Sequence, residues 1–328
     1  MPTLLLLATH DGLVVCGRNA GDDWRELRRG LAGQAVTSVI AREGVILAGT
    51  RLGIYRSDDA GVTWAPASTG LRQRHVRWLA YHPDTSDFEL AGTEPAGLFV
   101  SRDGGATWAG RPEVEALRDQ HHWFLPYSPE AGCVRSFAFH GTRLYAAVEV
   151  GGLLRSDDCG DTWRLVDGSD GNPDLAGPPA PYIYPDVHTI HVHPSSPDLL
   201  LAPTGGGFYR STDGGAHWEL IYACYVRAAW VDPADPAHIL LGPADNVDSH
   251  GRIEETRDGG ATWTLASGGL TVPWPSGMVE RFAAVGDEVL AVLNEGGLLA
   301  AKVNEWQWRT LVPGIPGINA VAALESAL

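Results

Sequence analysis

The chain has 328 residues, of which 44% are hydrophobic, so it is long and apolar enough to bury a full globular core. Its 40 acidic residues outnumber its 24 basic ones, and the formal net charge of −16 argues against nucleic acid or an anionic membrane as the main partner. No apolar run is long enough to span a bilayer, and Met1-Pro2 leads into an apolar segment without the basic region of a signal peptide. Four cysteines without a Cys-x-x-Cys spacing predict neither a zinc site nor a disulfide framework. Together these features predict a reduced, cytoplasmic protein.

A short motif of the form Ser-x-Asp-x-Gly-x-Thr-Trp recurs along the chain. Its seven copies, of which two are worn, end in chain order at Trp24, Trp64, Trp108, Trp163, Trp218, Trp263 and Trp308. A period of about 40 to 55 residues is typical of a propeller or a solenoid. The Asp is expected to bond the backbone of a tight turn, the glycines to supply positive φ, and the Trp to bury its ring between neighbouring sheets. The motif therefore predicts a structural turn, and its Asp residues are not candidates for catalysis.

Each repeat is interpreted as four strands. The first strands are expected to open with a small apolar signature, at residues 35–37, 75–77, 133–135, 186–188, 225–227 and 278–280. Residues 3–7 match a second strand, and residues 318–322 match a first strand. We therefore predict an all-β fold, a seven-bladed β-propeller of four-stranded antiparallel blades that forms one domain over residues 1–328. In this fold the C-terminal strand completes the N-terminal blade, which closes the ring.

The recurring motif resembles the Asp-box, or bacterial-neuraminidase, repeat, and the resemblance covers nearly the whole chain. It implies a β-propeller but no particular activity, because similar repeats occur in sialidases, xyloglucanases, sortilin-type receptors and photosystem II assembly factors. Sialidases with this repeat are six-bladed and carry an arginine triad and an early Arg-Ile-Pro segment. This chain has seven repeats and no Arg-Ile-Pro, so sialidase activity is not expected.

The residue after the apolar position of each first strand is expected to face the mouth of the central funnel. In successive blades these residues are Thr37, Arg77, Arg135, His188, Arg227, Glu280 and Asn319. Loops between second and third strands are expected to add Glu94, Glu149 and Asp245. Because a guanidinium presents a planar fork suited to carboxylate or phosphate, this ring favours an anion-binding site. The alternative is a structural network in which the arginines pair with those three carboxylates.

Two connections between blades are long. Residues 109–132 include His121, His122 and Trp123, and residues 164–185 include Tyr182 and Tyr184. Long loops are often functional, so these aromatic and histidine side chains are predicted to form a lid or a substrate wall over the funnel. The alternative is a flap that only covers the mouth.

Three histidines, His188, His191 and His193, alternate along one segment, which raises the hypothesis of a metal site. His193 falls at a position that recurs in other repeats, and His191 is expected to pack between blades. A divalent metal held by His188 with His121 or His122 and a carboxylate stays open. We assign no metal, and the sequence requires no cofactor.

The first functional hypothesis is a binding site for a small anionic, carboxylated, sugar-like ligand, with carbohydrate-active lyase or hydrolase chemistry as its catalytic form. The arginines would hold the anion. The candidate catalytic residues are His188, Tyr225, Glu280 and Glu149, because together they could supply a base and an acid.

Two alternatives belong to other classes. A glycosidase would need two funnel carboxylates about 5 Å or about 6.5–9.5 Å apart. A non-catalytic interaction or assembly propeller would instead bind a partner protein on one face.

Overall fold

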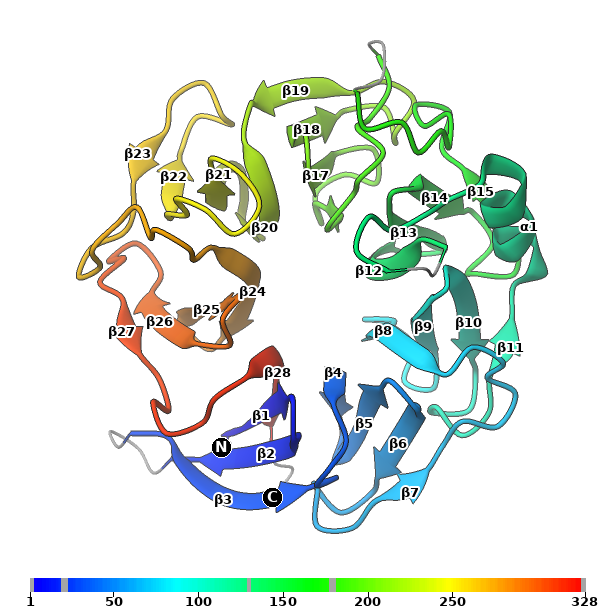
Figure 1. The fold of residues 1–328 in the computed structure, drawn as a ribbon, viewed down its shortest axis with the longest axis vertical. Helices are drawn as coiled ribbons and strands as arrows, with labels where there is room; N and C mark the ends of the chain where they lie inside the picture. Colours follow the sequence, from blue (N-terminus) through cyan, green and yellow to red (C-terminus); the bar gives the residue numbers. More distant parts are fainter. Residues whose placement is uncertain (1–2, 19–22, 129–130, 177–180, 326–328) are drawn as a thin grey trace. The chain divides into compact units, whose positions relative to one another are not determined.

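The computed structural model describes residues 3–18, 23–128, 131–176 and 181–325. Within these ranges the strands form seven four-stranded sheets, and one helix accompanies them (Figure 1). The fold is a seven-bladed antiparallel β-propeller, which confirms the predicted fold class. In the described part of the chain, no helix is long and apolar enough to cross a membrane.

The chain divides into two compact units. One contains Met1–Thr93, Phe99–Gly110 and Ala283–Leu328, and the other contains Glu94–Leu98 and Arg111–Phe282. The candidate site described below lies entirely in the second unit. That residues 1–328 form a single domain stays a prediction.

Each sheet is built from strands that follow one another in the sequence, apart from the N-terminal one. That sheet has the order β28 (Ile318–Glu325), β1 (Thr3–Thr9), β2 (Gly12–Gly17) and β3 (Arg25–Gly30). The next two are β4 (Val36–Arg42), β5 (Val45–Thr50), β6 (Gly53–Ser57) and β7 (Ala65–Pro66), then β8 (His75–Tyr81), β9 (Glu89–Glu94), β10 (Gly97–Ser101) and β11 (Ala109–Gly110).

The four remaining sheets repeat this order. The fourth and fifth are β12 (Cys133–His140), β13 (Arg143–Glu149), β14 (Gly152–Ser156) and β15 (Arg164–Leu165), then β16 (His191–Val192), β17 (Leu200–Thr204), β18 (Gly207–Ser211) and β19 (Glu219–Tyr222). The sixth and seventh are β20 (Tyr225–Asp232), β21 (Asp235–Ala244), β22 (Glu254–Thr256) and β23 (Thr264–Leu265), then β24 (Val279–Val285), β25 (Glu288–Leu293), β26 (Leu298–Lys302) and β27 (Arg309–Thr310).

The N-terminal sheet is completed by the C-terminal strand. β28, drawn in red, lies beside β1, drawn in blue, and the two pair antiparallel with Leu4 opposite Leu324 and Leu7 opposite Val321 (Figure 1). This confirms the expectation drawn from residues 3–7 and 318–322. Without β28, the backbone groups of β1 would form an open sheet edge.

The recurring turn is held by its own side chains. Ser57 Oγ donates to Asp59 Oδ1 over 2.8 Å and accepts from the Gly61 N–H over 2.8 Å. Asp59 also accepts from the backbone N–H and the hydroxyl of Thr63, over 2.8 and 2.7 Å. The same bonds recur around Asp103 and Asp158. Because these acceptors serve the turn, the Asp residues are structural, as predicted.

Acid stability is expected to depend on these turns. The hydroxyl and backbone N–H of the following threonine lower the pKa of Asp59, Asp158 and Asp258 to about 2. In an unfolded chain the pKa of Asp is about 3.9, so these carboxylates stabilise the fold above about pH 4. That contribution is lost as the pH falls from about 4 to about 2. Urea midpoints at about pH 5 and about pH 2.5 should therefore differ less in Asp158→Asn than in the wild-type protein. An equal difference in both would contradict this role, and Asp167→Asn, which alters a strongly exposed carboxylate, is the control.

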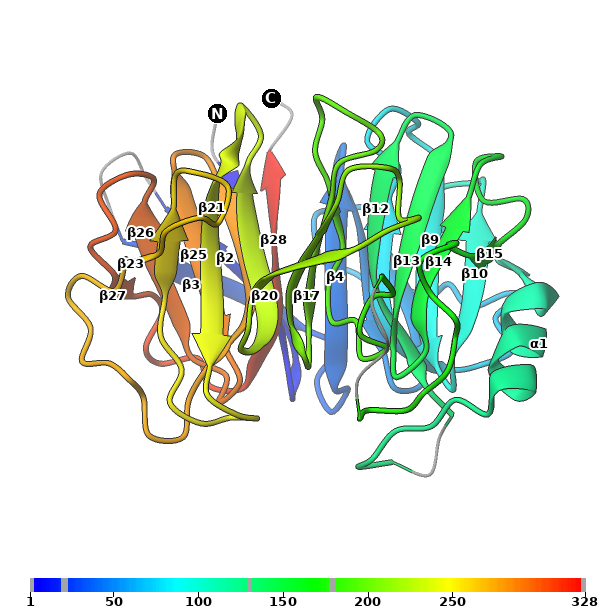
Figure 2. The same ribbon diagram turned by 90° about the horizontal axis from the view of Figure 1, so that it is seen from above.

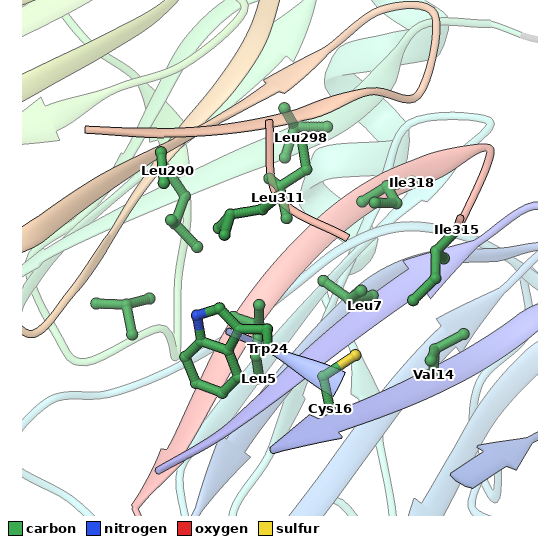
Figure 3. Packing of buried hydrophobic residues seen from close by; sticks show 13 residues of the cluster. Leu5, Leu7, Val14, Cys16, Trp24, Leu290, Leu298, Leu311, Ile315 and Ile318 are labelled. Carbon is green, nitrogen blue, oxygen red and sulfur yellow. The ribbon is translucent and has the colours of Figure 1, made fainter. Parts of the chain in front are cut away.

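Five of the repeated Trp residues, namely Trp24, Trp64, Trp108, Trp218 and Trp263, pack with residues of the preceding sheet. Trp24 is buried beside Leu290 and Leu298 of β25 and β26 and beside Leu5 and Leu7 of β1 (Figure 3). Burying a ring of this size between two sheets is a large apolar contribution. It explains why the Trp persists in worn repeats.

The first strands carry β-bulges at the predicted funnel positions. Pairing with the neighbouring strand shifts between Val36 and Ser38, between Val134 and Ser136, and between Val226 and Ala229. The skipped residues include Thr37, Arg135 and Arg227. A bulge re-aims the side chain of the extra residue, so these three side chains leave the normal alternation of their strands.

The fifth sheet departs from the expected pattern. His188 was expected within a first strand, but β16 contains only His191–Val192, and Val187 makes a single bridge to Thr204. The cause is Pro203 in β17, which has no N–H to donate to the neighbouring strand. The N–H groups of His188 and Thr189 both point to the Pro203 carbonyl instead.

The first long connection contains a helix that the sequence analysis missed. Residues 109–132 were interpreted as a loop, which is wrong over α1 (Pro112–His121). Proline near the start of the helix and acidic residues in its first turn are typical start signals. Its Arg111 cap residue donates from Nε to the Gly160 carbonyl, and Glu113 accepts from the Trp163 N–H. These bonds place α1 beside the outer strand β15 (Figure 2).

Candidate functional site

The centre of the candidate site is a buried arginine. Arg135, at the bulge in β12, is only 3% exposed. Its Nη1 donates to Glu149 Oε2 over 2.9 Å, and its Nη2 donates to Glu280 Oε1 over 2.7 Å. The guanidinium therefore holds two carboxylates, from β13 and β24.

Glu280 joins Arg135 to a second arginine. Arg227 Nη1 donates to Glu280 Oε2 over 2.8 Å and to Asp248 Oδ1 over 2.9 Å. Burial alone would raise the pKa of Glu280, but Arg227 and Arg135 outweigh it and lower that pKa to about 2. Glu280 therefore stays ionised at neutral pH, and this geometry suits a fixed counter-ion better than a group that gains and loses a proton.

His188 is fully buried and its ring is fixed by the backbone. Nδ1 lies 2.7 Å from the Val226 carbonyl oxygen, which only accepts, so Nδ1 carries a proton. Nε2 lies 3.1 Å from Asp186 Oδ2 and 3.4 Å from the Tyr225 hydroxyl. Burial raises the pKa of Tyr225 to about 12, so its phenol stays protonated and can serve as a donor.

Glu149 approaches the same point from β13. Tyr127 donates its hydroxyl to Glu149 Oε1 over 2.9 Å, and the Cys133 thiol donates to Oε2 over 3.1 Å. One side-chain oxygen each of Glu149 and Asp186 and one ring nitrogen of His188 all lie within 4.8 Å of one another. We call these three residues the His188 cluster.

Sequence reasoning missed Asp186 and Tyr127 as members of this site. Asp186 stands two residues before His188, and Cys133 and Tyr225 stand two residues before Arg135 and Arg227. The same spacing recurs in three neighbouring repeats, so this second register was a usable signal. Tyr127 carried no such signal, because it lies in a connection between blades.

The other predicted binding residues are not members of the His188 cluster. Glu94 Oε1 accepts from Ser128 over 2.9 Å, and Asp245, which is 63% exposed, pairs with Arg252 over 3.1 Å. Arg77 lies on β8, in the first unit, and is half-buried. That Arg77 binds the same ligand as Arg135 and Arg227 stays a prediction.

The expected lid of aromatic tips needs correction. Trp123 is 2% exposed, its indole N–H donates to the Gly171 carbonyl over 2.9 Å, and its ring lies against Gly151. It therefore packs one long connection onto the other, because a ring of this size is more stable buried than exposed at a tip. Tyr184 donates its hydroxyl to the Leu175 carbonyl over 2.7 Å, and Tyr182 is half-buried.

The two histidines of the first connection lie at the end of α1. His121 is its last residue, and His122 caps it in the left-handed region with φ of 55°. Among the described residues, the group suited to a metal ion joins His188 to Glu149 and Asp186 and includes neither His121 nor His122. Residues 129–130 and 177–180 of the long connections lie outside the described ranges.

Two cavities are lined by residues of the first unit. One, of about 120 Å³, is lined by Arg42, Arg56 and Glu89, and burial raises the pKa of Glu89 to about 7. The other, of about 360 Å³, is lined largely by apolar residues of β4, β8, β24 and β28. The charged side chains that meet around His188 in the second unit are the better candidate for a catalytic site.

Comparisons with known proteins place the fold but not the family. No protein-family model matches the chain. Over 125 residues it is 32% identical to an oligoxyloglucan-reducing end-specific xyloglucanase of Emericella nidulans, a match that covers 35% of this chain and 14% of that enzyme. The crystal structure of an ancestral GH74 enzyme aligns with a TM-score of 0.63 and 18% identity, over 93% of this chain and 40% of that one. YCF48 bound to a D1 peptide aligns with a TM-score of 0.61 and 13% identity, over 92% of this chain and 88% of that one.

These matches show a propeller with neighbours of different functions. The chain spans less than half the length of the GH74 structure, and its match to the xyloglucanase covers a small part of that enzyme. At these identities the structural matches show the fold alone. A function for this chain has to be argued from its own residues.

Proposed function

We propose that the His188 cluster is the active site of a carbohydrate-active enzyme, with hydrolysis as the favoured reaction. The observation that carries the proposal is the convergence of two largely buried carboxylates, Glu149 and Asp186, on the Nε2 atom of His188. Buried acid and base groups in contact are characteristic of sites that move protons. The local similarity to a xyloglucanase supports a sugar as the substrate.

The residues of the cluster have separate roles in this proposal. Glu149 is held in place by Tyr127, Cys133 and Arg135, so it supplies a fixed negative charge. Asp186 and His188 are the pair that can hold or exchange a proton. The two carboxylates lie closer together than the about 6.5–9.5 Å of an inverting glycosidase and nearer to the about 5 Å of a retaining one.

A small anionic, carboxylated ligand is the second candidate. Arg135 and Arg227 already hold Glu149, Glu280 and Asp248, so an anion has to replace one of these carboxylates. Asp248 is the replaceable one, because its side chain is 47% exposed whereas Glu149 and Glu280 are largely buried. An anionic sugar would therefore bind Arg227 in exchange for Asp248.

A turnover screen tests the proposal. We expect the wild-type protein to cleave one of three probes, namely xyloglucan oligosaccharides, other neutral glucan oligosaccharides or uronate oligosaccharides. In Asp186→Asn turnover should fall by about 10²–10⁴-fold, the usual loss for a proton-transfer group. In Glu149→Gln turnover should also fall, because the fixed negative charge of the cluster is lost. Mass spectrometry of the products gives the bond that breaks.

The matched control is Asp245→Asn, which changes an exposed carboxylate outside the cluster and should leave turnover unchanged. Wild-type protein that cleaves none of the probes would overturn the enzymatic proposal and favour a non-catalytic interaction propeller. Equal turnover in Asp186→Asn and wild type would remove the cluster from the reaction. Cleavage of uronates alone, with loss of binding in Arg227→Met, would favour the anionic ligand.

A further inference from the structure

We infer that Glu149, Asp186 and His188 bind a divalent transition-metal ion such as Zn²⁺ or Mn²⁺. The inference concerns the same cluster as the proposed function, but metal binding can be measured without any substrate. A metal ion at this point would deepen the proposal, because it would supply a Lewis acid or an activated water where the carboxylates converge.

A positive charge beside Nε2 of His188 would stabilise the hydrogen-bonding arrangement of this ring. Since Nδ1 donates to the Val226 carbonyl, the neutral ring has a lone pair on Nε2, to which the Tyr225 hydroxyl donates only over a long 3.4 Å. That lone pair lies 3.1 Å from Asp186 Oδ2, which is also an acceptor. Two acceptors this close repel each other unless a proton or a metal ion lies between them. A ring whose other N–H bonds a backbone carbonyl is also how metal-binding histidines are usually oriented.

The carboxylates of the cluster have oxygens suited to a metal ion. Asp186 Oδ1 is buried and has no hydrogen-bond partner, which is costly unless a cation occupies the place of that partner. Glu149 Oε2 is held by Arg135 and Cys133, so we assign Oε1, which accepts from Tyr127, as the oxygen that would bind the ion. The Tyr127 hydroxyl can then support the bound carboxylate as an outer partner.

The distances fit a metal ion with a small adjustment. Bonds from Zn²⁺ to nitrogen or oxygen are about 2.0–2.2 Å, so two ligand atoms are at most about 4.4 Å apart. The 3.1 Å between His188 Nε2 and Asp186 Oδ2 suits neighbouring ligands, and no pair in the cluster exceeds 4.8 Å. A movement of less than about 1 Å by one side chain would complete the site.

The local charge also favours a cation. The residues joined by the contacts above carry four carboxylates, namely Glu149, Asp186, Glu280 and Asp248, against two guanidiniums, Arg135 and Arg227. The Arg281 guanidinium also acts on Glu280, so four negative and three positive charges leave one negative charge uncompensated when His188 is neutral. This excess of negative charge favours a cation, and an imidazole with two carboxylates selects Zn²⁺ or Mn²⁺ rather than Mg²⁺ or Cu⁺.

Metal titration of chelator-treated protein tests the inference. Calorimetry with Zn²⁺ and Mn²⁺ should give one site per chain, and Co²⁺ should give a visible absorption band from its bound nitrogen and oxygen ligands. In Asp186→Asn and His188→Gln the affinity should fall by more than about tenfold, and the Co²⁺ band should be lost. The controls are Asp245→Asn and His193→Gln, which change a carboxylate and an imidazole outside the cluster and should keep the affinity.

A wild-type protein that binds none of these ions would overturn the inference, and so would equal affinity in Asp186→Asn. If either variant fails to fold, nitrogen NMR of the wild-type histidine rings decides. Zn²⁺ should shift the Nε2 resonance of His188 and leave Nδ1 protonated. If His188 is an imidazolium that Zn²⁺ does not affect, a proton rather than a metal ion lies between Nε2 and Asp186. Full turnover after removal of the metal by a chelator would contradict a metal ion at this site but not the proposed enzymatic activity. Metal binding by a protein that cleaves none of the probes would contradict the enzymatic activity but not the metal site.

Discussion

Replacing Arg135 with Met is expected to lower the free energy of unfolding by about 3–5 kcal/mol, the usual loss when one partner of a buried ion pair is removed. Arg135 is 3% exposed and is bound to Glu149 and Glu280. The substitution removes the guanidinium that is ion-paired with buried Glu149, and Glu280 loses one of the arginines that stabilise its charge. Urea unfolding followed by tryptophan fluorescence measures the change.

The control for this effect is Arg143→Met. Arg143 pairs with Asp157 and Asp198, both of which are about half exposed, so its loss should cost less than about 1 kcal/mol. The double variant Arg135→Met/Glu149→Gln should recover part of the stability, because it removes one of the stranded charges. If Arg135→Met were as mild as Arg143→Met, the ion pairs would not contribute to the fold, and the arginine would be free for a ligand.

Replacing Trp218 with Ala is expected to lower the free energy of unfolding by about 3–5 kcal/mol, as for other large aromatic residues in cores. Trp218 is 7% exposed and packs with Tyr145 and Leu153 of the fourth sheet and Leu200 of its own sheet. Its indole N–H donates to the Gly215 carbonyl over 3.2 Å, so the truncation also removes this hydrogen bond, whereas the carbonyl keeps the Gly168 N–H as a donor. The midpoint of thermal unfolding should fall sharply.

Phe124→Ala provides the comparison. Because Phe124 is 43% exposed, this substitution should lower the free energy of unfolding by no more than about 0.5 kcal/mol. Trp218→Phe should fall between the two, since it keeps most of the ring contact and loses the indole N–H. A loss for Trp218→Ala as small as that for Phe124→Ala would mean that neighbouring sheets do not depend on this contact.

The fold was predictable because its strongest signals are local and repeated. The bonds around Asp59 and the burial of Trp24 are properties of one turn and the strands beside it, and they recur. The departures come from single residues whose effect depends on a neighbour. Pro203 shortens the strand paired with it, and Pro112 starts a helix where only a loop was expected. Both prolines were visible, but their consequences depend on which backbone groups they face.

The sequence predicted most of the residues that form the site but not which of them pair with one another. The funnel register selected Arg135, Arg227, His188 and Glu280, and the structure brings all four into contact through a short series of bonds. The sequence left open whether the arginines bind a ligand or internal carboxylates. In the structure they hold Glu149, Glu280 and Asp248, which agrees in part with the structural alternative. Sequence spacing could not give these partners, because they come from other strands and loops.

The pairing of β28 with β1 has a consequence for the order in which the protein is made. The segment of β1 leaves the ribosome early, yet β28, which completes its sheet, is synthesised only after the strands of the other six sheets. Until then β1 keeps an unpaired edge while every later sheet can form from consecutive segments. Contacts across so much of the chain are slow to form, because the intervening polypeptide has to be ordered first. Newborn chains therefore pass through a stage in which the N-terminal sheet is the least protected part, and chaperone binding or premature proteolysis should concentrate there.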